Sequence, residues 1–485
     1  MGREVITEGQ INRIFSKELT LDEISRIGER ITTHPDAKYM IYYHKNSPRA
    51  NKIPMMLRPR VIRAYQLKYY HEVGLEIVRA FKKLLPLYLA SGNPPRKGTD
   101  EIKGLFPFTE DEKEYLEDIY RDPSFAKNIG KNYDDIPVVA RLDSNASFQN
   151  PVLEDSFKLF EINGVAIGAV YFESTIESIV KDVVIPTLTM IDPKLTLINT
   201  PDIRHLLIND ILSHARTLGY TNPNIGFLED KKDMYGTREY SYFVPYYKRM
   251  GYNVFHVDPR ELYLKDGRIY YKGKSMDVIY RDCEISDLIR LQKKDRKISI
   301  LKKYFATNQV ISSIAGEFDH KGAFELFSNA KFASYFSARQ RELFKRHILW
   351  TRVIRETRTT DPYGKEVDLI KYILKNKDGL LIKPNRGLGG SGIKLGPSLT
   401  NREWEESVDD ALKFPSSQVV QSLSTVVTER FPVLDRNKNL LLDDLYTDAG
   451  FVITKGGVGI LSRVSKDKVV NIAKGGGMCA VVVVK

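Results

Sequence analysis

The stretch Leu380-Leu-Ile-Lys-Pro-Asn-Arg-Gly-Leu-Gly-Gly-Ser-Gly-Ile-Lys394 decides the fold of this chain. Its apolar start predicts a strand that delivers Lys383, and a glycine-rich turn then leads into another strand. The loop residues are Gly387, Gly389, Gly390, Ser391 and Gly392. Glycines let backbone N–H groups approach an anion closely, so the loop can wrap phosphates while Lys383 supplies positive charge. No Gly-Lys-Ser/Thr follows, which excludes a P-loop, and the strand after the glycines excludes a dinucleotide-binding fingerprint. Taken alone, the run also fits a flexible turn.

A second signal lies earlier, where Arg141-Leu-Asp143 is followed by Phe160-Glu-Ile-Asn-Gly164. Glu161 and Asn163 are two residues apart on a predicted strand, so their side chains share one face. A carboxylate beside an amide oxygen suits Mg²⁺, a hard cation that keeps several waters and bridges substrate phosphates. An ordinary exposed strand face would also explain the pair.

A third signal lies near residue 470 and has two parts. The first is the predicted strand Gly459-Ile-Leu-Ser-Arg-Val464, and the second is the glycine turn Gly475-Gly-Gly-Met478. The guanidinium of Arg463 can bind a planar anion through two parallel hydrogen bonds, and exposed N–H groups of Gly476 and Gly477 can bind another oxygen. The segment therefore predicts a clamp on a carboxylate.

Together and in this order, the motifs resemble the circularly permuted ATP-grasp superfamily, which includes glutathione synthetase and glutathionylspermidine synthase. The Arg-x-Asp and Glu-Ile-Asn motifs precede the nucleotide lysines, as the permutation demands. Residues 318–328 look like the family's helix with the first ATP lysine, here Lys321, and residues 418–425 are similar to its adenine hinge. The resemblance extends over about residues 55–480, with low identity outside the motifs.

The resemblance implies a role for each matching position. The residues expected to bind ATP are Lys321, Lys383, Gly387, Gly389, Gly390, Ser391, Gly392, Val420, Gln421 and Leu423. Those expected to face the carboxylate substrate and its acyl phosphate are Arg141, Asp143, Arg463, Gly476 and Gly477. The catalytic cations would be Arg141, Arg386 and Arg463, and Mg²⁺ would bind Glu161 and Asn163.

One position departs from the family. Glutathione synthetase has a glutamate just before the glycines that completes the metal site, whereas Gly387 stands there in this chain. Asp448 or Asp143 could supply the missing charge, or fewer protein ligands are used. We include Asp448 among the expected metal ligands, although an ordinary strand-end carboxylate would also explain it.

These expectations add up to an ATP-dependent carboxylate–amine ligase. The carboxylate would take the γ-phosphoryl group of ATP, and an amine would then attack the acyl phosphate, releasing ADP and phosphate. ATP and Mg²⁺ are the implied cofactors, and the partners are a small-molecule carboxylate and an amine. The amine could be an amino acid, a peptide or a polyamine. Two alternatives stay open: a small-molecule kinase, and a non-catalytic or nucleic-acid-binding protein on the same scaffold.

The predicted fold class is α/β (α+β), a circularly permuted ATP-grasp fold in four parts. Residues 1–125 form a helical N-terminal region, with a helix pair over 57–89. Residues 126–199 form the strand-rich segment with Glu-Ile-Asn, and 296–485 form the nucleotide-binding region, with a helix over 321–336. Residues 200–295 form an inserted parallel-sheet domain, where we expect contacts with the acceptor. The candidates there are Tyr235, Arg238, Tyr242, Arg281 and Asp282.

Composition limits the kinds of ligand and the cellular location that we expect for this chain. The net charge of +12 suits an anionic ligand or a nucleic acid, but the positive charge is spread along the chain and nucleic-acid binding is not favoured. No run of about 18 apolar residues predicts a membrane span, and residues 1–10 lack the layout of a secretory signal. Cys283 and Cys479 have no CxxC partner, which favours two reduced buried thiols over a disulfide. A cytoplasmic location is therefore expected, and a homodimer is expected only at the family level.

Overall fold

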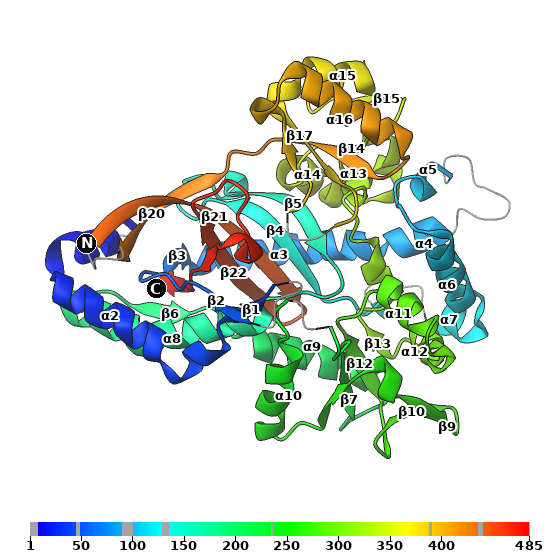
Figure 1. The fold of residues 1–485 in the computed structure, drawn as a ribbon, viewed down its shortest axis with the longest axis horizontal. Helices are drawn as coiled ribbons and strands as arrows, with labels where there is room; N and C mark the ends of the chain where they lie inside the picture. Colours follow the sequence, from blue (N-terminus) through cyan, green and yellow to red (C-terminus); the bar gives the residue numbers. More distant parts are fainter. Residues whose placement is uncertain are drawn as a thin grey trace.

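The computed structural model describes residues 8–44, 49–89, 100–128, 135–233, 236–387, 390–434 and 440–484. The chain forms a mixed α/β structure around a central antiparallel sheet with the order β23-β22-β21-β4-β5, and β20 pairs with β21 outside this path. The strands of this sheet are β4 (Ala140–Ala146), β5 (Phe157–Asn163), β20 (Val427–Leu434), β21 (Leu440–Thr454), β22 (Gly457–Ser465) and β23 (Gly477–Met478). Figure 1 shows it between two smaller lobes.

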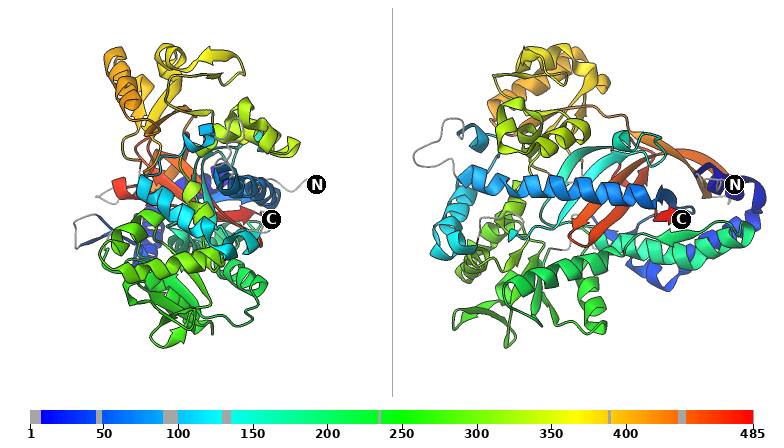
Figure 2. Two further views of the ribbon diagram at one scale, coloured as in Figure 1. Left: turned by 90° about the vertical axis from the view of Figure 1, so that its right-hand side faces the viewer. Right: turned by 180° about the vertical axis from the view of Figure 1, so that it is seen from behind.

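Helices cover both faces of the central sheet, as the alternation of side chains along β21 requires. Ile453 packs in the same apolar cluster as α3 (Ala64–Lys82), whereas its neighbour Val452 packs with α9 (Ile203–Thr217) on the other face. The backbone of α3 approaches the sheet closely at Gly74, where a Cβ atom would lie 2.2 Å from Ile453 Cδ1. Figure 2 shows α3 running along the sheet on the side opposite to the view of Figure 1.

The lobe drawn in green contains a parallel sheet with the order β13-β12-β7-β8. Its strands are β7 (Ile225–Leu228), β8 (Val254–Val257), β12 (Val278–Arg281) and β13 (Val310–Ile311). The Asp266-Gly267 turn has positive φ at both residues and joins β9 (Tyr263–Lys265) to β10 (Arg268–Tyr271), as expected for a hairpin. The predicted small parallel sheet is therefore present, and β13 extends it beyond residue 295.

The other lobe contains a second antiparallel sheet with the order β14-β19-β17-β18, and the views of Figures 1 and 2 place it across the central sheet from the parallel one. Its strands are β14 (Thr351–Val353), β17 (Leu380–Pro384), β18 (Lys394–Leu395) and β19 (Gln418–Ser422). Helices α14 (Ala338–His347), α15 (Leu369–Lys375) and α16 (Asn401–Lys413) belong to this lobe, and Trp404 of α16 lies in its core.

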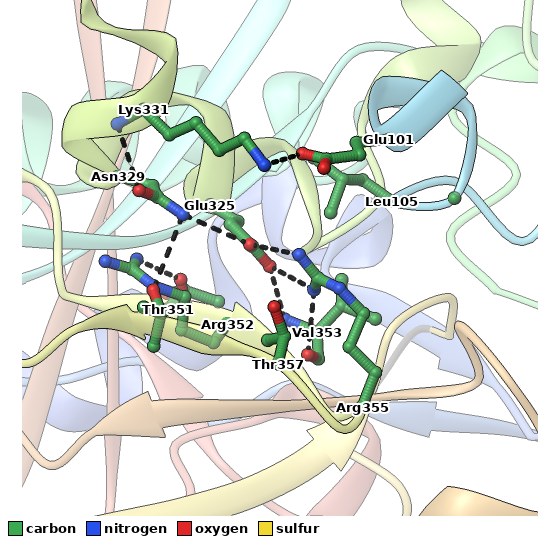
Figure 3. A network of polar contacts seen from close by, with 12 residues as sticks. Glu101, Leu105, Glu325, Asn329, Lys331, Thr351, Arg352, Val353, Arg355 and Thr357 are labelled. Atoms are coloured by element: carbon green, nitrogen blue, oxygen red, sulfur yellow. Dashed lines mark hydrogen bonds and ion pairs between the residues drawn. The ribbon is translucent and has the colours of Figure 1, made fainter. Parts of the chain in front are cut away.

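A buried polar network fixes the outer strand of this lobe (Figure 3). Glu325, on α13 (Ala323–Ser328), accepts a hydrogen bond from the N–H of Val353 at 2.7 Å and pairs with Arg355 at 2.7 Å. Arg352 is fully buried and donates to the Thr351 carbonyl at 2.7 Å and the Thr359 hydroxyl at 2.6 Å. Because every buried charge here has partners, β14 is held firmly beside β19.

Two predicted helices are wrong in part. Residues 60–63 form the strand β3 (Arg60–Arg63), which pairs in parallel with β24 (Val481–Val484), so the predicted helix pair begins only at α3. Val61 and Ile62 of this strand are buried. Residues 321–336 contain only the short α13 followed by a 3₁₀ turn, and Lys321 lies before the helix.

Shorter elements complete the fold. The N-terminal region is not only helical, because β1 and β2 form a hairpin there. The remaining helices are α1 (Glu8–Arg13), α2 (Leu21–Thr33), α4 (Leu84–Leu89), α5 (Asp100–Lys103), α6 (Glu110–Arg121), α7 (Pro123–Asn128), α8 (Val170–Ile191), α10 (Tyr240–Arg249), α11 (Ile285–Gln292) and α12 (Leu301–Ala306). The remaining strands are β1 (Ile41–Tyr43), β2 (Ala50–Lys52), β6 (Leu197–Asn199), β11 (Lys274–Ser275), β15 (Arg358–Thr360) and β16 (Glu366–Asp368).

Cys283 and Cys479 are both free and buried, as the sequence favours. Across the ranges that the structure describes, every helix falls short of the length and apolarity needed to cross a bilayer.

Candidate active site

One large cavity, of about 760 Å³, is lined by residues from the central sheet and from both lobes. Fifteen of the candidate site residues from the sequence line it: Arg141, Asp143, Glu161, Asn163, Arg238, Asp282, Lys321, Lys383, Gly387, Gly390, Ser391, Gln421, Leu423, Asp448 and Arg463. Motifs separated by up to 320 residues therefore meet in a single concave site.

The register of the central sheet brings the charged side chains of the cavity together. Asp448 of β21 pairs with Arg463 of β22, and Asp143 of β4 pairs with Glu161 of β5. Arg141 lies two positions before Asp143, so the two side chains share a face of β4. Four adjacent strands thus contribute to one row of acids and arginines.

Arg463 is the centre of this row. Its Nη2 atom lies 2.7 Å from Asp448 Oδ2 and 3.2 Å from Asp143 Oδ2, and its Nε donates to Asp448 Oδ1 at 3.0 Å. Arg141 donates to both carboxylate oxygens of Asp143, at 2.6 and 3.0 Å. Burial opposes ionisation of Asp143, but Arg141 and Arg463 outweigh it and hold its pKa below the usual value. Burial raises the pKa of Asp448 although Arg463 opposes the shift.

Gly450 leaves room for this arrangement, and its role was not predicted. It lies opposite Asp143 in the sheet, and a Cβ atom there would be 3.0 Å from both Arg141 Cδ and Asp143 Oδ1. A glycine inside a strand often marks such a close approach, so the sequence did contain a weak signal.

Lys383 reaches the same cavity from β17. It is 3% exposed, and its Nζ donates to the Phe160 carbonyl and to Gln421 Oε1, both at 2.9 Å. Burial, with a smaller contribution from Lys321, lowers the pKa of Lys383 to about 7. Gln421, which the resemblance assigns to ATP binding, holds the lysine with its side chain, and its Nε2 donates to Thr351 Oγ1 at 2.8 Å.

Lys321 lines the same cavity and contacts Glu161. Its Nζ is 2.8 Å from Glu161 Oε1 and donates to the Gly387 carbonyl at the start of the glycine loop, at 2.9 Å. The motif around Lys321 is tied to the Glu-Ile-Asn strand, because Asp319 Oδ2 accepts a hydrogen bond from the N–H of Gly164 at 2.8 Å. Burial and then Glu284 raise the pKa of Asp319 to about 8.

The donors for a metal ion are few. Glu161 and Asn163 line the cavity and supply the carboxylate and amide oxygens that Mg²⁺ accepts. In the described part of the chain no group of three His, Cys, Asp or Glu side chains is placed to hold a metal, and the Asp448 carboxylate is occupied by Arg463. The residues therefore fit a Mg²⁺ ion that arrives with a nucleotide and keeps waters, and do not fit an all-protein cage.

Several predicted site residues lie away from the cavity wall. Arg386 is held by Glu112 at 2.5 Å and Glu284 at 2.8 Å. Gly476 and Gly477 pack against Asn471 and Pro54, where a Cβ atom would lie 2.7 and 2.8 Å from backbone oxygens. The remaining members of this group are Gly392, Val420, Tyr242 and Arg281. Two predicted residues, Gly389 and Tyr235, fall outside the described residues.

The sequence missed most of the acids that the parallel sheet contributes to the cavity wall. The carboxyl ends of the parallel strands β7 and β12 deliver Glu229, Asp230, Asp282 and Glu284 to its wall. Only Asp282 was among the candidates. Asp282 is exposed on the cavity wall, where the surrounding protein displaces bulk water, and this partial desolvation together with the charge of Glu229 raises its pKa to about 7. The rule that ligands bind outside the carboxyl ends of parallel strands could have identified the others.

Comparison with known proteins finds a likeness in structure but none in sequence. No protein-family model matches the chain, and no curated protein matches it significantly. Among solved structures, it is similar to a glutathione synthetase like-effector from Globodera pallida, determined in the apo form. The two share 11% sequence identity and a TM-score of 0.53, over 96% of each chain. At this identity the likeness shows the fold alone, and the chain has the fold of a glutathione synthetase-like protein.

Proposed function

We propose that this chain is an ATP-dependent carboxylate–amine ligase. The observation that supports the proposal best is the meeting of two distinct sets of groups in one cavity. Lys321, Lys383 and the glycine loop suit a triphosphate, and the network of Arg141, Asp143 and Arg463 suits a carboxylate. The fold shared with a glutathione synthetase like-effector is consistent with both halves of this assignment.

At the nucleotide end, the two lysines would neutralise the phosphates and the loop would exclude water. Lys321 would exchange Glu161 for a phosphate oxygen, which frees that carboxylate. Lys383 keeps two neutral oxygen acceptors and has one further N–H for a phosphate. Glu161 and Asn163 would hold Mg²⁺, which supplies charge neutralisation of the transferring phosphoryl group when it is bound.

At the carboxylate end, Arg463 and Arg141 would orient the acid substrate. A substrate carboxylate competes with Asp143 and Asp448 for these guanidinium groups, so binding exchanges one anion for another. The substrate oxygen then attacks the γ-phosphorus, the bond to the β-phosphate oxygen breaks, and ADP leaves from the acyl phosphate. The amine nitrogen next attacks the acyl carbon, and the C–O bond to phosphate breaks.

The acids at the end of the parallel sheet would serve the amine. An amine must lose a proton as it forms the amide, and Asp282 faces the cavity with a pKa of about 7. A carboxylate with a pKa near neutrality suits a general base at that step.

An ADP-release screen of carboxylate and amine pairs, with mass spectrometry of the products, tests the proposal. The expected result is ADP, phosphate and an amide, and only when both substrates are present. ADP with a phosphorylated small molecule would indicate a kinase instead. Tight binding of ATP without any product across the screen would favour a non-catalytic scaffold.

A further inference from the structure

One fully buried side chain beside the lysines takes no part in lining the cavity. Asn385 follows Lys383 by two positions, directly after β17, and is 0% exposed. Its backbone N–H donates to the Ser417 carbonyl at 2.8 Å, and its side-chain Nδ2 donates to Leu105 O at 2.9 Å and Ser416 O at 2.8 Å. Asn385 also accepts two hydrogen bonds, both from the backbone around Lys321.

The backbone around Lys321 is attached to Asn385. The N–H of Lys321 donates to the Asn385 carbonyl at 2.9 Å, and the N–H of Gly322 donates to Asn385 Oδ1 at 2.7 Å. These N–H groups precede α13 and have no helical partner, so Asn385 supplies the acceptors they need. Gly322 packs closely against Leu105, because a Cβ atom at this position would lie 2.2 Å from the Leu105 carbonyl oxygen.

The same residue is also fixed to the strand of Lys383 and to the glycine loop. Two peptide units separate it from Lys383, and its hydrogen bonds to residues 416 and 417 hold the end of β17 beside β19. Two positions after Asn385, the Gly387 carbonyl accepts the hydrogen bond from Lys321 Nζ. One side chain thus joins the backbones that carry both lysines.

Only an amide can make this set of bonds. The side chain must accept from one N–H group and donate to two carbonyl oxygens at the same time. A carboxylate in the same shape would face the Leu105 and Ser416 carbonyls without a hydrogen to donate, and an aliphatic side chain would leave all three groups unpaired.

We propose that Asn385 is a positioning residue that sets the spacing of Lys321 and Lys383 for a polyphosphate. This inference rests on the proposed function, because it assumes that the two lysines bind ATP. Asn385 does not touch the nucleotide itself. Its loss therefore weakens the binding of the phosphates and leaves the binding of the nucleoside unchanged.

The test compares the affinities of ATP and adenosine, measured by calorimetry in the full chain. The variants are Asn385→Asp and Asn385→Ser, each also followed by thermal unfolding. We expect the ratio of ATP affinity to adenosine affinity to fall at least tenfold in both variants. A merely structural role would lower both affinities together and leave this ratio at the wild-type value, which would overturn the inference.

Asn329→Ala is the matched control. Asn329 is also buried in this lobe and belongs to the network of Figure 3, where its Oδ1 accepts from the N–H of Lys331 at 3.1 Å. The control should lower the thermal midpoint without changing the affinity ratio. If it changes the ratio as much as the Asn385 variants do, the effect belongs to the lobe and the inference is wrong.

The outcomes separate the inference from the proposed function. If the wild-type chain binds adenosine and ATP equally, the phosphate site itself is absent and both fail. If the wild type prefers ATP and the variants keep that preference, only the inference about Asn385 fails. Failure of both Asn385 variants to fold would also overturn it, because the residue would then be needed for the lobe as a whole.

Discussion

At the scale of single residues, the cations of the cavity already have partners before any substrate binds. Lys321 is paired with Glu161, and Arg463 with Asp143 and Asp448. Lys383 differs, because the two hydrogen bonds that its buried ammonium donates go to the neutral oxygens of Phe160 and Gln421 and not to a carboxylate. A buried charge without a counter-ion destabilises the fold, so a triphosphate would supply what the lysine lacks.

Replacing Lys383 separates this role from folding. Lys383→Met keeps the apolar stem and removes the charge, so we expect ATP turnover to disappear while the thermal midpoint stays equal or rises. Lys394→Met is the control, since Lys394 lies on β18 of the same sheet and donates to Ser407. Normal turnover in the Lys383 variant would remove this lysine from the phosphate site.

The protonation of Lys383 predicts a pH dependence of ATP binding. Its pKa is about 7 in the free protein, and a bound triphosphate favours the charged form and raises that pKa. Binding of ATP above pH 7.5 should therefore take up a proton. The affinity for ATP should decrease as the pH rises, by at most about tenfold per pH unit. Calorimetry in buffers of different ionisation enthalpy measures the uptake, and the Lys383→Met variant should show none. Proton release on binding would contradict the assignment.

The lowered pKa of Lys383 also makes the stability of the fold depend on pH. The unfolded chain keeps a proton at Lys383 up to the ordinary lysine pKa of 10.5, whereas the folded chain loses it near pH 7. Between these two pH values the unfolded state binds more protons than the folded state. The contribution of Lys383 to the free energy of unfolding therefore increases as the pH rises from 7 to 10.5.

At the scale of secondary-structure elements, the central sheet determines the site through its register. The pairing of β4 with β5 shifts at Asp143 and Ser144, so that Glu161 lies opposite Asp143 and Leu159 opposite Ser144. Phe160 lies at this irregularity, and its carbonyl accepts the hydrogen bond from Lys383 Nζ at 2.9 Å. A bulge commonly removes one residue from the ladder, and here it connects the central sheet to β17.

Gly450→Ala tests the importance of this register. The added Cβ atom would contact Arg141 and Asp143 at 3.0 Å, so the pair that faces the carboxylate must shift. Since small displacements of positioning groups cost about 100-fold, we expect kcat/KM for the carboxylate to fall by that order while ATP affinity is unchanged. The control is Gly379→Ala, where nothing lies within 4 Å of the added atom. A variant with normal kinetics would show that the Arg141–Asp143 pair does not position substrate.

Local patterns predicted the elements of the site better than their connections. The two-residue period along β5 correctly placed Glu161 and Asn163 toward one cavity, and the Asp-Gly turn identified the β9–β10 hairpin. The pairing of β3 with β24 was missed, because it joins residues about 420 positions apart and neither strand carries a local sign of its partner. The five hydrogen bonds of Asn385 were missed for the same reason.

At the scale of the whole molecule, Arg386 links three parts of the chain. It follows β17 and pairs with Glu112 of α6 and with Glu284 after β12. The sequence suggested a catalytic cation at this position, but the two carboxylates occupy the guanidinium. The glycine loop, the helical region and the parallel sheet therefore share an ion-pair connection near the cavity.

Arg386→Met distinguishes a catalytic role of this arginine from a structural role in the ion pairs with Glu112 and Glu284. It leaves the Glu112 carboxylate buried without its cation, so we expect a loss of stability on the order of 3 kcal/mol. Activity measured well below the unfolding transition should fall less than tenfold. A variant with an unchanged thermal midpoint and abolished turnover would restore Arg386 as a catalytic residue.

The most direct test is a crystal structure of the chain with Mg²⁺ and a non-hydrolysable ATP analogue. We expect the β- and γ-phosphates in the 760 Å³ cavity, with phosphate oxygens within hydrogen-bond distance of Lys321 Nζ and Lys383 Nζ. The ion should lie beside Glu161 and Asn163. A triphosphate bound elsewhere, or bound in the cavity but away from both lysines, would contradict the proposed function.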